Sequence, residues 1–210
     1  MKIFIFSWLC LFGYASYAQQ TFEVNGIVYK EDLSRKDKMC VTVQRKMVDD
    51  PAGYMVQSYY SGNINVPSKI EHNLDVYEVT GIAKWAFWIC EGLTSLTINE
   101  GVERLYPYTI WGKNLTTLKL PDSLERIDDF AINSSPGVLH SVTFGKNINY
   151  IGQYNFQGTL NEVTFIQETP LLECPPFLKD HPDITINIPK GSSNNYQAAW
   201  GNLNFKESTK

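Results

Sequence analysis

The feature that most constrains this chain is a sequence repeat inside it. Four six-residue segments, LTSLTI, LTTLKL, LHSVTF and LNEVTF, share one apolar pattern. Their leading leucines are Leu93, Leu115, Leu139 and Leu160, which lie 22, 24 and 21 residues apart. A period of about 20–50 residues is typical of a chain that folds as a stack of similar units. The repeat therefore predicts a solenoid.

The first three units share seven apolar positions, at offsets 0, 3, 5, 9, 12, 15 and 17 from the leading leucine. Offsets 3 and 5 alternate as in a short strand with one face inward. Offsets 9 and 12 fit a second short strand or a turn, and offset 17 fills the core. A unit this short cannot bury its apolar side alone, so units must stack with their strands about 4.8 Å apart.

These offsets predict a mainly β, right-handed solenoid of about four or five repeats of 21–24 residues. Little helical periodicity occurs, so we expect the convex side to be extended or irregular. The residues at offset 3 of the four units should form one core ladder, made of Leu96, Leu118, Val142 and Val163.

The two ends of the chain differ from the repeats. Residues 22–29 and 39–45 alternate as strands around the turn residues Asn25-Gly26, which predicts an N-terminal β-hairpin cap. Residues 63–78 fit an entry strand and a loop. Residues 184–201 predict a strand, a turn and a short C-terminal capping helix packed by Tyr196 and Trp200. We divide the chain into a signal peptide (1–18), an N-terminal β cap (19–62), a repeat solenoid (63–183) and a C-terminal cap (184–210).

The first 18 residues have the layout of a cleaved secretory signal. Lys2 precedes an apolar run of about ten residues, and the small residues Ser16 and Ala18 precede Gln19. The run is too short to cross a bilayer, which needs about 20 apolar residues, and no later segment is long enough. Cys10 lies inside the run, without the context of a lipoprotein signal. We expect a secreted, periplasmic or cell-surface protein with no lipid anchor and no transmembrane segment.

Charge and residue types exclude several classes of function. The chain carries 18 Lys plus Arg against 22 Asp plus Glu, so no broad positive field is available for nucleic acid. No catalytic motif or paired Cys-His arrangement occurs, and Asp128-Asp129 should point to opposite faces of an extended segment, on a solvated surface. We predict no catalytic residue, no metal and no cofactor, and hence no enzyme.

The three cysteines that follow the signal are Cys40, Cys90 and Cys174. Their odd number leaves at least one thiol free, and whether two of them pair stays open at this point. A disulfide framework is therefore not what stabilises this fold.

The repeat pattern resembles the BspA-like leucine-rich repeats of bacterial surface proteins, common in Bacteroidetes. Residues 82–93 (IAKWAFWICEGL) resemble that family's I-G-x-x-A-F-x-x-C-x-x-L motif, and residues 168–176 and 186–200 resemble its terminal segments. The sequence departs from the pattern where Tyr106-Pro107 follows Leu105, because glycine is usual there. The resemblance covers nearly all of residues 20–205. It implies an exported or surface-exposed protein, similar in some members to adhesins, and a buried structural position for Cys90.

Aromatic residues recur at two outer offsets and form the candidate ligand-binding site. Trp85, Tyr108, Phe130 and Tyr154 share one offset, and Trp88 and Trp111 share another. Stacking should place each set in a row. Packing alone would also explain the first row, whereas two exposed tryptophans side by side would suit a sugar face or an apolar protein anchor.

We select Trp85, Trp88, Tyr108 and Trp111 as candidate ligand-binding residues. The expected function is binding or adhesion to a protein or glycan through the solenoid surface, with host extracellular proteins among the candidate partners. The alternative is a structural or assembly protein of the cell envelope that has no soluble ligand.

Overall fold

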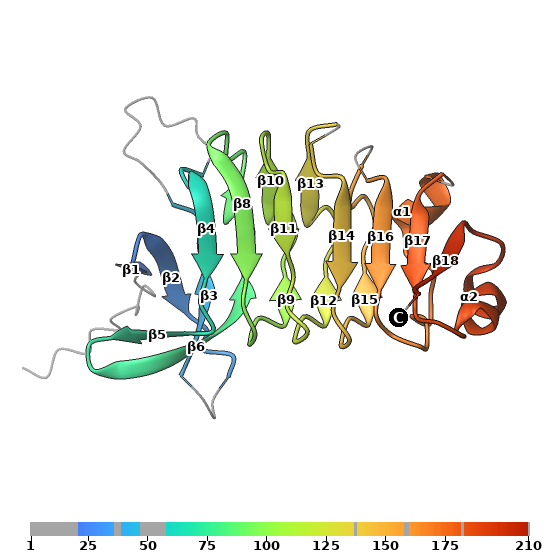
Figure 1. Cartoon of the computed structure of the whole chain (residues 1–210). Helices are drawn as coiled ribbons and strands as arrows, with labels where there is room; N and C mark the ends of the chain where they lie inside the picture. The colour runs from blue at the N-terminus through green and yellow to red at the C-terminus, as the bar shows by residue number, and fades with distance from the viewer. Residues whose placement is uncertain are drawn as a thin grey trace, which may run out of the picture.

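The computed structural model describes residues 21–35, 39–46, 58–136, 138–157, 160–181 and 183–209. The predicted signal peptide, residues 1–18, lies outside the described residues. Strands stack side by side from an N-terminal cap at one end to two short helices at the other (Figure 1). This arrangement confirms the predicted mainly β solenoid.

The N-terminal cap consists of three strands that join the solenoid directly. These are β1 (Thr21–Val24), β2 (Ile27–Glu31) and β3 (Cys40–Val43). Strands β1 and β2 form the predicted hairpin, and the turn between them has positive φ at Asn25 and Gly26, which both residues tolerate. Strand β3 pairs in parallel with a strand of the solenoid, so that the cap continues one side of the stack.

Three strands follow the cap: β4 (Gly62–Val66), β5 (Lys69–His72) and β6 (Asp75–Ile82). The predicted entry strand is present as β4. The expected loop is wrong, because β5 and β6 form an antiparallel hairpin. Its turn residues Asn73 and Leu74 both have positive φ. This turn lacks glycine, which is the reason that the sequence pattern did not reveal it.

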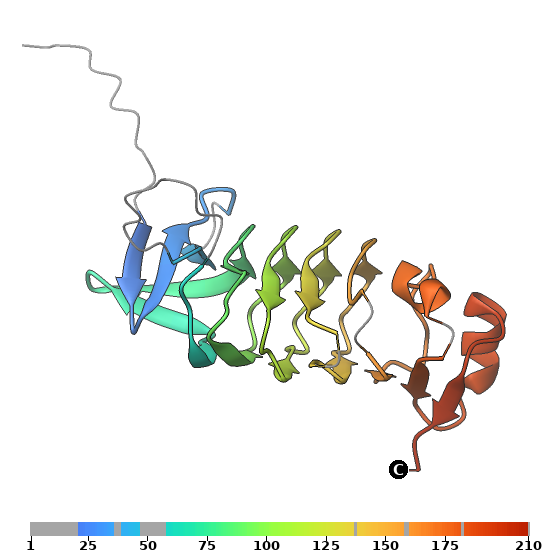
Figure 2. The ribbon, with the colours of Figure 1, turned by 90° about the horizontal axis from the view of Figure 1, so that it is seen from above.

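The strands of the repeats lie on three sides of the solenoid, which Figure 2 shows from above. The first side holds β8 (Leu93–Ile98), β11 (Thr117–Lys119), β14 (Ser141–Phe144), β16 (Glu162–Phe165), β17 (Thr185–Ile188) and β18 (Phe205–Glu207). The second side holds β9 (Arg104–Leu105), β12 (Arg126–Ile127) and β15 (Tyr150–Ile151). The third side holds β7 (Phe87–Trp88), β10 (Ile110–Gly112) and β13 (Ile132–Ser134).

The register confirms two parts of the predicted core ladder on the first side. Leu96 pairs with Leu118, and Val142 pairs with Val163, in parallel strands. The ladder is not one continuous sheet, because β11 and β14 belong to different sheets. All four side chains are buried. The third side was not predicted as a sheet: offset 17 fills the core as expected, and its residues also pair in parallel from one repeat to the next.

The C-terminal end closes the stack with aromatic side chains. The predicted helix is α2 (Ser193–Trp200), and its Tyr196 and Trp200 are buried as expected. Their rings contact each other and Phe165, the last residue of β16. A second helix, α1 (Pro176–Asp180), was not predicted, because five residues are too few to show a helical period.

Candidate functional site

One corner of the solenoid, between its second and third sides, carries the aromatic residues selected from the sequence. Trp85, Tyr108, Phe130 and Tyr154 all lie there with φ between 56° and 64°, the left-handed region. The backbone amides of Trp85 and Tyr108 donate to the carbonyls of Tyr108 and Phe130 in the next repeat, at 3.0 and 3.2 Å. These bonds hold a conformation that a non-glycine residue adopts only at a cost of about 1–2 kcal/mol.

The aromatic side chains at this corner are not a requirement of the backbone. A left-handed position favours Gly or Asn, because they have little or no side-chain clash there. Four successive repeats nevertheless carry large rings at this position. What they share is therefore an aromatic ring rather than a residue type suited to the backbone. Tyr154 is 49% exposed, and the other three are partly buried.

The rings touch along the row as predicted for its last three members. The ring centroids of Tyr108 and Phe130 lie 5.2 Å apart and those of Phe130 and Tyr154 lie 4.5 Å apart, both in stacked orientation. Between Trp85 and Tyr108 the Lys84 ammonium intervenes, 4.2 Å from the first ring centroid and 5.3 Å from the second. This is cation–π distance, so that the row begins with a cation held between two rings.

Trp88 and Trp111 lie side by side on the third side of the solenoid. They are register partners in β7 and β10, and their ring centroids are 5.4 Å apart. Trp88 also meets the Tyr108 ring edge-on at 5.3 Å. The two rows therefore form one surface, which we call the aromatic ridge: Trp85, Trp88, Tyr108, Trp111, Phe130 and Tyr154.

The expectation of two exposed tryptophans side by side needs correction in its degree of exposure. Both are partly buried, because they pack on each other and Trp88 packs on Tyr108. The aromatic ridge is consequently a surface of rings that already pack on one another, and not two indoles that are each surrounded by solvent. The next residue of the same row, Asn133, is the register partner of Trp111 and is also partly buried.

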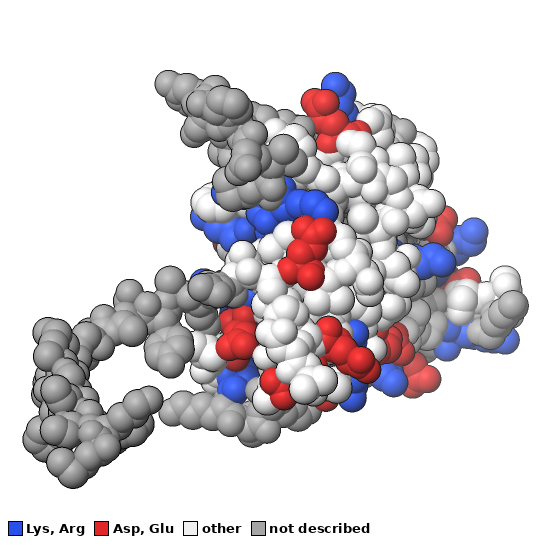
Figure 3. All heavy atoms as spheres, turned by 90° about the vertical axis from the view of Figure 1, so that its left-hand side faces the viewer, with Lys and Arg blue, Asp and Glu red and all other residues white. Residues whose placement is uncertain are grey.

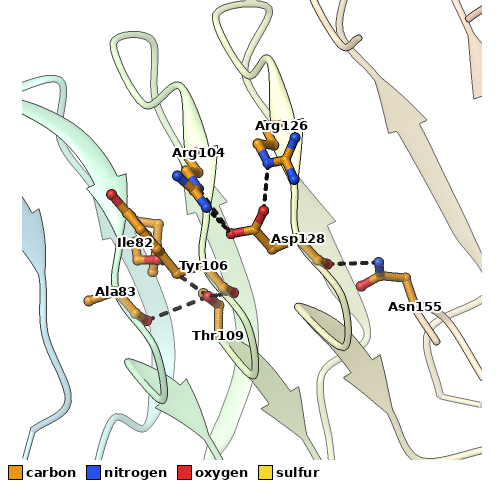
Figure 4. Close-up of polar contacts among 8 residues, drawn as sticks. All are labelled: Ile82, Ala83, Arg104, Tyr106, Thr109, Arg126, Asp128 and Asn155. Carbon is orange, nitrogen blue, oxygen red and sulfur yellow. Dashed lines mark hydrogen bonds and ion pairs between the residues drawn. The ribbon is translucent and has the colours of Figure 1, made fainter. Parts of the chain in front are cut away.

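The prediction of a solvated Asp128 is wrong. Its side chain is 6% exposed and accepts from Arg104 Nε and Nη2 at 2.9 and 2.7 Å, and from Arg126 Nε at 2.6 Å. Figure 4 shows the carboxylate between the two guanidinium groups. Asp129 is exposed, so the two carboxylates do point apart as expected. Arg104 and Arg126 are 22 residues apart in the sequence, and this repeat spacing could have indicated that they lie in register on neighbouring strands.

Buried polar side chains link neighbouring repeats beneath the ridge. Thr109 donates its hydroxyl toward the backbone carbonyls of Ile82 and Tyr106, and Asn155 donates to the carbonyl of Asp128 at 3.0 Å (Figure 4). Asn155 Oδ1 also accepts from the Ile132 amide at 2.9 Å. Because such buried groups have their partners, they add rigidity to the corner that carries the rings.

Cys40, Cys90 and Cys174 are all buried and unpaired. Burial raises the pKa of the Cys90 thiol to about 11, and the thiol donates to the Ser58 carbonyl at 3.3 Å. This agrees with the structural position implied for Cys90. Within the described residues, no group of three or more His, Cys, Asp or Glu side chains could hold a metal ion. In that same part of the chain, no helix has the length and apolar character to cross a membrane.

The family model of the BspA type leucine-rich repeat region matches residues 63–172 in six copies. A leucine-rich repeat protein from Bacteroides capillosus ATCC 29799 has a similar structure, with a TM-score of 0.50 and 19% identity over 69% of this chain and 97% of that one. A leucine rich cell surface protein from Faecalibacterium prausnitzii A2-165 has a TM-score of 0.58 and 15% identity over 87% of this chain. This chain spans 42% of that protein. No curated protein matches the sequence.

Proposed function

Because the chain belongs to the BspA-type leucine-rich repeat family, we propose that it is an exported binding module that holds a protein or glycan ligand on the aromatic ridge. The observation that carries the proposal is the run of large rings at left-handed backbone positions, a conformation that does not itself require a ring. Aromatic side chains provide large contact area at low conformational-entropy cost, and they dominate binding energy at many interfaces.

The first side of the solenoid offers no comparable surface. The outer positions of the first-side strands are small or polar, as at Thr97, Lys119 and Thr143, and offer no anchor of comparable size. The ridge, in contrast, joins six rings over four repeats. Export rests on the signal-like residues 1–18, and the Faecalibacterium protein of similar fold is described as a cell surface protein. Both support a surface or extracellular location.

The test is a binding screen of the protein that begins at Gln19 against host matrix proteins and glycans. Any ligand is then measured with Trp88→Ala/Trp111→Ala, and with Thr97→Ala/Lys119→Ala as the matched control on the first side. We expect the ridge variant to lose binding by at least about tenfold, which corresponds to about 1.4 kcal/mol, and the control to retain it.

A melting temperature measured for each variant separates lost binding from lost folding. Because Trp88 and Trp111 pack on each other, Trp88→Phe/Trp111→Phe is included to keep most of the apolar contact. Undiminished binding by a folded ridge variant would contradict the proposal. A screen in which the wild-type protein binds nothing would favour the structural role in the cell envelope.

A further inference from the structure

Most ring faces along the aromatic ridge are covered by contacts within the protein. Phe130 stacks between Tyr108 and Tyr154, with ring centroids 5.2 and 4.5 Å away, so both of its faces are occupied. The rings of Tyr108 and Trp85 also meet the Lys84 ammonium, at 5.3 and 4.2 Å from their centroids. A ligand that stacks on a ring face therefore has little access to these three rings.

The Trp85 end of the row is a charged surface. Besides the Lys84 ammonium, the Arg45 guanidinium carbon lies 5.8 Å from the centroid of the Trp85 ring. Figure 3, seen from this end of the molecule, shows Lys and Arg atoms close to Asp and Glu atoms. An uncharged ligand ring would have to displace a cation in order to stack here.

The Tyr154 end of the row is open. Among the described residues, Phe130 is the one ring that contacts Tyr154, and Tyr154 is 49% exposed. The next unit begins at Leu160 and has Pro175 at the same offset, so the row of rings ends with Tyr154. One further ring-shaped group, supplied by a ligand, could continue the stack.

Two exposed polar side chains accompany Tyr154 at this end. Asp129 Oδ1 accepts from the Gln153 backbone amide at 2.9 Å, and Gln153 directly precedes Tyr154. Within the described part of the chain, no cation pairs with Asp129, and the side-chain amide of Gln153 has no hydrogen-bond partner. A ligand on Tyr154 would therefore find a carboxylate oxygen and an amide ready for hydrogen bonds.

A pyranose sugar matches this combination of a ring face and polar groups. Its C–H groups carry a small positive charge and suit the negative face of an aromatic ring. Its hydroxyls can donate to the Asp129 carboxylate, and hydrogen bonds to a charged acceptor are roughly twice as strong as neutral ones. An apolar side chain of a protein ligand would cover the same carboxylate without pairing it, which costs free energy.

The charge of Asp129 also selects among sugars. A second carboxylate placed beside it would be repelled, so an acidic sugar fits this position less well than an uncharged one. Resting on the proposed function, we infer that the ridge ligand is a glycan, and that one uncharged sugar of this glycan stacks on Tyr154 and forms hydrogen bonds with Asp129 and Gln153.

The experiment measures sugar affinities by isothermal titration calorimetry. The uncharged probes are hexasaccharides of glucose, mannose and N-acetylglucosamine, and hexagalacturonate is the acidic probe. Tyr154→Leu keeps an apolar contact with Phe130 but has no ring face, whereas Tyr154→Trp keeps a ring face. Asp129→Asn removes the charge, and its matched control is Glu125→Gln, which removes another exposed carboxylate from the residue before β12.

We expect the wild-type protein to bind at least one uncharged hexasaccharide about tenfold or more tightly than hexagalacturonate. Tyr154→Leu should weaken that binding at least about tenfold, because it removes the central aromatic contact, and Tyr154→Trp should retain it. Asp129→Asn should weaken it about threefold and reduce the discrimination against hexagalacturonate, whereas Glu125→Gln should change neither.

A melting temperature measured for each variant confirms that it is folded. The inference would be overturned if folded Tyr154→Leu bound the sugar as tightly as the wild-type protein does. It would equally be overturned if the wild-type protein bound hexagalacturonate as tightly as the uncharged probes, or bound none of the four sugars.

The outcomes also separate this inference from the function on which it rests. If a matrix protein binds, Trp88→Ala/Trp111→Ala abolishes its binding and no sugar binds, the ridge is a binding surface for protein and the sugar site is wrong. If a sugar binds, is lost in Tyr154→Leu and is unaffected by Trp88→Ala/Trp111→Ala, the sugar site is correct and the rest of the ridge is not the ligand surface.

Discussion

The first two ridge-bearing repeats and the next two use the same outer position for different chemistry. Trp88 and Trp111 occupy it at the N-terminal end, where their rings pack together. Asn133 and Gln157 occupy it farther along, where Asn133 Oδ1 accepts from the Gln157 amide at 3.2 Å. Asn133 is the register partner of Trp111 in the parallel sheet, and Gln157 lies beyond the last strand of that sheet, β13. Within the sheet the backbone therefore accepts either a tryptophan or an asparagine at this position. The fold fixes the inward positions and leaves the outward ones available for recognition.

Charged substitutions at the inward positions should therefore destabilise the protein equally in the earlier and the later repeats. Leu118→Asp would bury a carboxylate without a partner and should cost several kcal/mol, at the upper end of the roughly 0.5–5 kcal/mol seen for point changes. Val142→Asp should behave alike. Lys119→Asp, one residue farther along β11 and exposed, should cost less than about 1 kcal/mol. Urea unfolding of the three variants checks this, and a cooperatively folding Leu118→Asp of near wild-type stability would show that the register is wrong.

A second difference between the two ends concerns their buried thiols at high pH. Burial raises the pKa of Cys90 from an ordinary value of 9.0 to about 11. Burial also raises the pKa of Cys174, and the nearby Lys179 opposes that rise. The unfolded chain therefore releases the Cys90 proton first. The protonated Cys90 thiol contributes fully to the free energy of unfolding below pH 9. This contribution falls by roughly 2–3 kcal/mol as the pH rises toward 11.

Urea midpoints measured from pH 8 to pH 10.5 test this prediction. Cys90→Ala should reduce the loss of stability at alkaline pH more than Cys174→Ala does. Native Cys90 should also react slowly with thiol reagents, because a buried thiol in apolar surroundings is inert. Rapid labelling of Cys90 in the folded protein, or a decline that Cys90→Ala leaves intact, would contradict its place in the core.

The two carboxylates of Asp128-Asp129 provide a comparison within one repeat. Asp128→Asn keeps one oxygen but turns an amide N–H₂ toward an arginine, so that one of the two guanidinium groups loses its acceptor and both lose the negative charge between them. We expect a loss of about 1–3 kcal/mol. Asp129→Asn affects an exposed side chain that accepts from the Gln153 amide at 2.9 Å, and should cost less than about 1 kcal/mol. Thermal melts of both variants check the order, and equal losses would contradict it.

Much of this architecture was predictable from spacing, because stacking makes each offset a physical neighbour of the same offset in the next unit. That argument places Leu96 beside Leu118 and Trp88 beside Trp111 from the spacing alone, and the register agrees. It could not show how deeply the two indoles pack. That depth depends on the orientation of the rings, and Tyr108 contributes to it from another offset.

The features that could not be predicted depend on contacts between residues at different offsets of the repeat, or between a repeat and the cap. Asp128 stands where the family pattern has glycine, and its burial follows from two arginines on neighbouring strands. Gly152 keeps the glycine at this offset, and an added Cβ would come within 2.6 Å of the Asp129 backbone nitrogen. A hollow beside Trp85 joins Gln44 of the cap to Lys84 of the first repeat. No periodic pattern relates those two segments.

The smallest expected effect comes from extending the tryptophan row by one repeat. Asn133 is the register partner of Trp111, so Asn133→Trp should place a third ring beside the first two. The exchange loses the hydrogen bond from the Gln157 amide and a longer one, at 3.4 Å, to the Tyr154 carbonyl, and it gains an aromatic contact. A hydrogen bond and an aromatic contact are each worth about 0.5–1.5 kcal/mol, and the exposed 3.4 Å bond contributes least. The free energy of unfolding should therefore change by less than about 1 kcal/mol, while near-ultraviolet circular dichroism reports the new ring contact. Asn133→Ala is the matched control, because it loses both bonds without adding a ring. If Asn133→Trp destabilises the protein much more than Asn133→Ala does, the polar position in the later repeats is part of the fold rather than an open outer site.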